Sequence, residues 1–123
     1  MEDRPIVQER PRLPHEGLHA YQVAKELLAF VAERRGCLRG LPGEISSHLE
    51  RSAVSALLNI AEAAGRTSPR DRKMRFAIAR GEACELAAAL EAARIFGALG
   101  EGEYERARGL IVRLVQMLRR LSD

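Results

Sequence analysis

Near the amino terminus, His15, Glu16 and His19 form an H-E-x-x-H pattern, the spacing by which many zinc proteases hold their metal. On a helix, positions four residues apart share one face. The two imidazoles would then bind one zinc ion, while Glu16 would activate a zinc-bound water molecule. The pattern therefore raises the hypothesis of a zinc hydrolase.

Two features of the sequence weigh against a zinc site at this pattern. Pro14 and Gly17 place it in the first turn of a helix, whereas a catalytic pattern of this kind needs the middle of a stable helix. A third ligand is not evident, because the remaining histidine, His48, lies far along the chain, without the distal spacing of metzincins. We therefore expect a chance match, with neither a metal nor a cofactor, and keep a zinc hydrolase as a remote alternative.

The composition predicts an all-α protein. The chain has 123 residues with 46% hydrophobic content, which suits one globular domain with a modest core. Aromatic residues make up 4%, while Ala, Leu, Arg and Glu dominate, as is typical of packed amphipathic helices. Two cysteines are too few for a disulfide framework, and no apolar signal segment or membrane span is evident. We expect a cytoplasmic protein without a membrane partner.

Apolar residues at helical spacing predict four helices with short connections. Their approximate ranges are residues 17–35, 44–64, 69–97 and 103–122. Residues 1–14 mix charge with three prolines and predict a flexible N-terminal arm, so the bundle domain covers residues 15–123. Such an arrangement favours an antiparallel up-and-down four-helix bundle.

The start of the third predicted helix carries specific signals. Ser68 can cap the helix, Pro69 fits its first turn, and Asp71 favours the positive end of the helix dipole. We therefore expect the third helix to begin at this segment.

A narrow polar stripe marks the second predicted helix. Steps of about 100° per residue place six polar side chains on one face between apolar flanks. These residues are Arg51, Ser52, Ser55, Asn59, Glu62 and Arg66. The stripe is either an ordinary solvated face or an interface, where Asn59 and Glu62 hydrogen-bond across helices and pair with an arginine of the third helix. Both interpretations stay open at this point.

The stretch "SAVSALLNIAEAAGRTSPRDRKMRFAIARGEACEL" resembles the signature of the bacterial 23S ribosomal RNA intervening-sequence proteins. The matching positions are Asn59 to Glu62, Gly65, Arg66, Ser68, Ala79, Gly81, Glu85 and Leu86. The stretch "LHAYQVAKELLAFV" resembles the beginning of the family, so the match extends from Leu18 to Leu121. Two positions depart from the pattern: Ala63 replaces a glycine and Glu82 replaces a serine.

The resemblance implies a four-helix bundle that assembles as a homopentamer and has no enzymatic activity. Family-motif positions with a polar or interface role are Arg51, Ser55, Asn59, Glu62 and Glu85. A distant relative of the family, the accessory protein of diversity-generating retroelements, binds a reverse transcriptase and nucleic acid. Two classes of partner are therefore expected besides a second copy of the chain: nucleic acid and protein.

Positive charge is concentrated where the second predicted helix passes into the third. The basic residues there are Arg66, Arg70, Arg72, Lys73, Arg75 and Arg80. Asp71 is the one acidic residue among them, so this segment carries more net charge than the +3 of the whole chain. We predict that these six side chains bind the phosphate backbone of RNA or DNA, and that a ring of subunits multiplies the surface. The alternative is a scaffold for a protein such as a reverse transcriptase, with a merely solubilising basic face.

Overall fold

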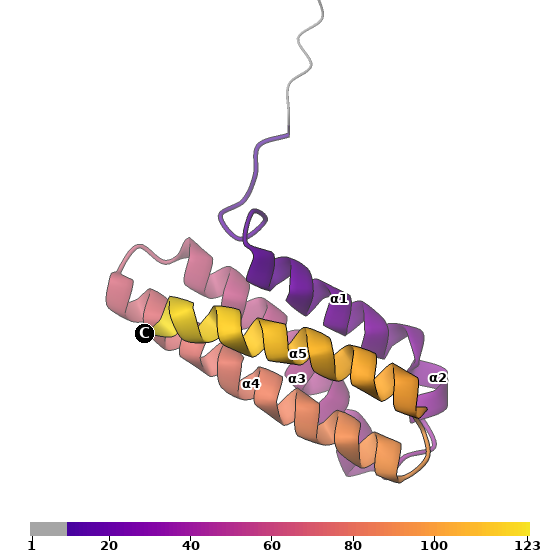
Figure 1. Ribbon diagram of the computed structural model, residues 1–123. Helices are drawn as coiled ribbons and strands as arrows, with labels where there is room; N and C mark the ends of the chain where they lie inside the picture. Colours follow the sequence, from indigo (N-terminus) through magenta and orange to yellow (C-terminus); the bar gives the residue numbers. More distant parts are fainter. Residues whose placement is uncertain (1–9) are drawn as a thin grey trace, which may run out of the picture.

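The computed structural model describes residues 10–123, in which every regular secondary-structure element is a helix (Figure 1). The helices are α1 (His19–Glu33), α2 (Arg35–Leu38), α3 (Gly43–Gly65), α4 (Pro69–Ile95) and α5 (Glu101–Ser122). The four long helices run alternately up and down the bundle, which confirms the predicted fold class.

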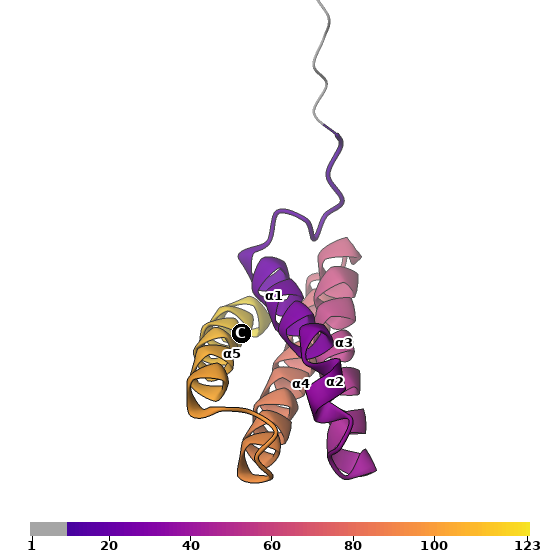
Figure 2. The same ribbon diagram turned by 90° about the vertical axis from the view of Figure 1, so that its right-hand side faces the viewer.

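The four long helices surround one core. Helices α1 and α4 lie opposite each other, and each packs against both α3 and α5 (Figure 2). Side chains from all four fill the centre: Leu27, Leu49, Ile60, Phe76, Leu86, Leu114 and Leu118, each at most 1% exposed. The connection between α3 and α4, the start of α1 and the end of α5 lie at the same end of the bundle (Figure 1). We call this end, which holds residues 66–68, the turn end.

Buried alanines let α3 and α4 approach closely, and this pair shares the most extensive helix interface. Six alanines of the two helices are at most 2% exposed: Ala53, Ala56, Ala63, Ala79, Ala83 and Ala93. The start of α4 follows the sequence signals, because the Ser68 hydroxyl accepts a hydrogen bond from the backbone N–H of Asp71 and Pro69 opens the helix. The predicted cap is therefore confirmed.

The helix boundaries differ from the predicted ranges by one or two residues at several ends; α1, for example, ends at Glu33 and α5 begins at Glu101. The first helix begins at His19 rather than Gly17, because the chain turns at residues 14–17 and the N–H of Leu18 bonds the carbonyl of His15. The short helix α2 lies where we predicted a break, and its buried Leu38 packs on the core. Helix α4 stops at Ile95, because Gly97 adopts a left-handed conformation with φ of +82°.

The end of α4 shows why that glycine is needed. Ala98 donates a hydrogen bond to the carbonyl of Ala93, and Gly97 donates one to that of Arg94. This is the Schellman arrangement, whose left-handed residue costs least when it is glycine.

Most of the predicted flexible arm, residues 1–9, lies outside the described residues. The division into an arm and a bundle domain therefore stays a prediction. Within residues 10–123, no helix combines the length and the apolar character that crossing a membrane requires.

Candidate nucleic-acid interface

The H-E-x-x-H pattern forms a turn rather than one face of a helix. His15 and Glu16 precede α1, and only His19 belongs to it. The Glu16 carboxylate accepts a 2.7 Å hydrogen bond from the N–H of Leu13 and a 3.1 Å bond from Arg10. Across residues 10–123, no three His, Cys, Asp or Glu side chains gather as a group that could hold a metal ion. The helical geometry that motivated the zinc hypothesis is thus not present.

Three of the six predicted nucleic-acid-binding residues already have partners within the bundle. The Glu62 carboxylate lies 3.3 Å from Arg66 on its own helix and 3.3 Å from Nε of Arg75 on α4. Arg80 donates a 3.2 Å hydrogen bond to the Ser122 hydroxyl at the end of α5. Arg75 and Arg80 therefore link neighbouring helices, whereas the pair that Arg66 makes is local to the end of α3.

Arg70, Arg72 and Lys73 form no ion pair with any residue in the described range 10–123. They belong to the first turns of α4, whose opposite face is fixed in the core by Phe76, 1% exposed. Arg70 and Lys73 are exposed and Arg72 is half-buried. We call these three residues the turn-end cations.

Charge is divided unequally along the bundle axis. The half that contains the turn end (residues 10–26, 54–82 and 112–123) has twelve Lys and Arg against six Asp and Glu. The other half of the described chain (27–53 and 83–111) has seven against eight. Folding therefore collects the positive charge at one end.

Sequence reasoning overlooked the contribution of α5 to this end. Between Glu105 and Asp123 the helix carries five arginines and no acidic residue. Its last turns bring Arg119 and Arg120, both exposed, to the turn end. The run of arginines was a usable signal, but its position beside the α3–α4 turn depends on how the bundle closes.

The polar stripe of α3 divides into separate contacts. Within one copy of the chain Asn59 does not bond across helices, since its amide donates to the Ser55 carbonyl and hydroxyl of the same helix. Ser52 is fully buried and donates to the carbonyl of His48 rather than facing solvent. Glu62 does approach an arginine of α4, as described above.

Arg51 and Glu85 form the second contact between α3 and α4. Arg51 lies 2.8 Å from the Glu85 carboxylate, and Nδ1 of His48 lies 2.8 Å from the same oxygen. The hydrogen bond from His48 and the charge of Arg51 lower the pKa of Glu85 below its ordinary value. These groups fix the register of the two helices.

Apolar side chains also lie exposed on the same two helices. Leu58 is 60% exposed, Met74 50% and Ile78 40%. None of them was singled out from the sequence. We call them the outer apolar residues of α3 and α4.

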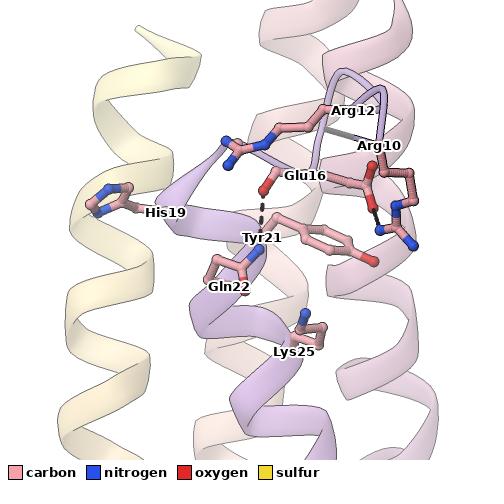
Figure 3. A pocket seen from close by; sticks show the side chains of 8 residues that line it. Arg10, Arg12, Glu16, His19, Tyr21, Gln22 and Lys25 are labelled. Carbon is pink, nitrogen blue, oxygen red and sulfur yellow. Dashed lines mark hydrogen bonds and ion pairs between the residues drawn. The ribbon is translucent and has the colours of Figure 1, made fainter. Parts of the chain in front are cut away.

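A cleft of about 730 Å³ lies where the chain enters α1 (Figure 3). Its basic lining residues are Arg10, Arg12, His19 and Lys25, and Glu16 is its one carboxylate. Tyr21 projects into the same space, and Lys25 Nζ lies 5.9 Å from the centre of its ring. We call this the N-terminal cleft; no part of it belonged to the predicted nucleic-acid site.

Two comparisons find similar proteins. The family model described as "23S rRNA-intervening sequence protein" matches residues 16–120. A crystal structure of a protein of unknown function from the S23 ribosomal protein family, from Bacteroides thetaiotaomicron, superposes with a TM-score of 0.78. That similarity covers 85% of this chain and 98% of the other at 20% sequence identity, and so shows the fold alone. No curated protein matches the chain.

Proposed function

Because the chain belongs to the family of 23S rRNA-intervening sequence proteins, we propose that it is a non-enzymatic accessory protein that binds the phosphate backbone of RNA or DNA. The observation that carries this proposal concerns where Arg70, Arg72 and Lys73 lie and whether a carboxylate pairs with them. They stand at the start of a rigid helix, within the half of the described chain that carries the excess of basic residues, and no carboxylate of that range pairs with them.

The electrostatics of these residues favour phosphate as the ligand. A side-chain cation that already pairs with a carboxylate gains little free energy from binding a phosphate. An unpaired cation instead takes the place of counterions condensed on the nucleic acid, and their release favours binding. Arg119 and Arg120 extend the positive surface from α5. Contacts to phosphate carry no sequence information, so the proposed binding has little sequence preference.

The proposal includes assembly as a homopentamer. The outer apolar residues Leu58, Met74 and Ile78 lie on adjacent helices and expose large side chains. A ring of five copies uses one surface against a different surface of the next subunit, which can cover such side chains. Five turn ends in one ring would also bind a single nucleic-acid chain with increased avidity.

The salt dependence of RNA binding tests the proposal. Fluorescence anisotropy with a labelled duplex RNA should show binding at about 50 mM salt that falls steeply toward about 200 mM. Three neutralised phosphates per subunit correspond to a slope of log affinity against log salt of about −2.7. No binding at low salt would contradict the proposal. An affinity that does not change with salt concentration would instead indicate an apolar contact, as in the protein-scaffold alternative.

A further inference from the structure

The N-terminal cleft combines chemical groups that the turn-end cations lack. Arg12 and Lys25 face it as cations that make no ion pair within residues 10–123, and Tyr21 adds a half-buried aromatic ring. Figure 3 shows the ring extending between the side chains of Arg10 and Glu16 on one side and of Lys25 on the other. An aromatic ring beside several cations suits a ligand with both a flat π-system and negative charge.

We propose that the N-terminal cleft binds a nucleotide of a single-stranded nucleic acid, with its phosphate against Arg12 and Lys25 and its base against Tyr21. A base within a duplex is stacked between its neighbours and cannot reach a side chain in a cleft, whereas an unpaired base can stack on an aromatic ring. The inference rests on the proposed function and assigns the ligand class of a second surface.

The turn at residues 14–17 shapes this cleft. Glu16 holds Arg10 through its carboxylate, and its backbone carbonyl accepts a 3.1 Å hydrogen bond from the Gln22 amide. The His15 ring lies edge-on to Tyr21, with ring centres 4.5 Å apart. Glu16 is thus a positioning residue: it keeps Arg10 at the cleft, and it does not have to touch the ligand.

A second groove lies on the side of α1 that faces α5, where the His19 side chain points away from Tyr21 (Figure 3). His19 lines both the N-terminal cleft and a neighbouring groove that Met117 and Arg120 share. A strand that leaves the cleft through this groove therefore meets another exposed cation at the turn end. Single-strand and duplex surfaces would lie side by side on one end of the bundle.

Tyrosine fluorescence gives a direct test, because the chain has two tyrosines and no tryptophan. Tyr104 is 8% exposed and donates a hydrogen bond to Glu91, so Tyr104→Phe removes the second emitter at little structural cost. In this variant, a single-stranded oligouridine should quench the emission of Tyr21, and a duplex RNA of the same length should not. Unchanged emission at saturating oligouridine would overturn the inference.

Affinity measurements supply the second test. Tyr21→Leu keeps an apolar side chain but removes the stacking surface, and it should weaken oligouridine binding about tenfold or more. Lys25→Gln should weaken it as well, and the matched neighbour Glu26→Gln, which changes an exposed acid outside the cleft, should not. Circular dichroism should show the same helicity in all three variants.

Comparison of the two RNA probes separates this inference from the proposed function. If Tyr21→Leu loses oligouridine affinity but binds duplex RNA like the parent, both are supported. If Tyr21→Leu binds both probes like the parent, while Arg70→Glu with Lys73→Glu strongly weakens duplex binding, the inference about the cleft is overturned and the proposed function survives. If neither probe binds the parent at about 50 mM salt, both fail.

Discussion

The Glu62 carboxylate on α3 lies 3.3 Å from Nε of Arg75 on α4, and the same oxygen lies 3.3 Å from Arg66. One carboxylate thus pairs with two of the arginines predicted to bind nucleic acid. Arg75 is nevertheless not aligned to donate a hydrogen bond from Nε. Glu62 therefore reduces the positive charge that the turn end offers to phosphate.

Glu62→Gln should strengthen RNA binding, because it releases both arginines. The salt slope should steepen by as much as about 1.8 per subunit, if each arginine then neutralises one phosphate. The pairs are partly exposed, so the free energy of unfolding should change by less than about 1 kcal/mol. Glu50→Gln, at the other end of α3, is the control and should leave affinity unchanged. Weaker RNA binding by Glu62→Gln would contradict this role.

Close approach of α3 and α4 depends on small buried side chains. Ala83 is fully buried, so Ala83→Leu should overpack the interface and lower the free energy of unfolding by about 1–3 kcal/mol. Ala88 lies on the exposed side of the same helix, and Ala88→Leu should have little effect. Urea unfolding of both variants measures the difference; equal stabilities would show that the interface is loosely packed.

The fold was more predictable from the sequence than the site. Ser68, Pro69 and Asp71 act over one helical turn, so their effect could be predicted without tertiary contacts. The turn at His15 and the bond from Asn59 to Ser55 were missed, because local backbone geometry, rather than residue spacing, decides them. Spacing offered a pair between Glu62 and an arginine of the third helix as one of two alternatives, but it could not identify Arg75 or show that α5 adds arginines to the turn end.

The contact among His48, Arg51 and Glu85 should make stability depend on pH. The hydrogen bond from His48, aided by Arg51, keeps the pKa of Glu85 below its ordinary value of 4.5 in the folded chain. Ionised Glu85 then stabilises the fold at pH values above its unfolded pKa, and this contribution disappears as the pH falls through the folded pKa. The stability difference between the parent and Glu85→Gln should therefore be present at about pH 6 and shrink as the pH falls below 4.5 and through the folded pKa of Glu85. A difference that persists in acid would contradict this assignment.

The outer apolar residues should control assembly. Light scattering of the parent should give the mass of five subunits of 13.6 kDa each. Replacing Leu58 and Ile78 together by serine should yield a smaller species with unchanged helicity, because neither side chain belongs to the buried core. Leu13→Ser removes an equally exposed side chain outside the bundle helices and should leave the mass unchanged. A monomeric parent at micromolar concentration would exclude the pentamer.

Charge reversal at the turn end tests whether the turn-end cations bind RNA. Arg70→Glu with Lys73→Glu should lower duplex RNA affinity at about 100 mM salt by two orders of magnitude or more, with unchanged helicity and melting temperature. The matched control is Arg39→Glu with Arg106→Glu, two exposed residues in the far half of the bundle. Dissolved ions screen charge interactions beyond about 10 Å, so these substitutions should not affect phosphate binding at the turn end. Only the first pair of substitutions should lower the RNA affinity. Equal RNA affinity of the parent and the Arg70 and Lys73 double variant would contradict it.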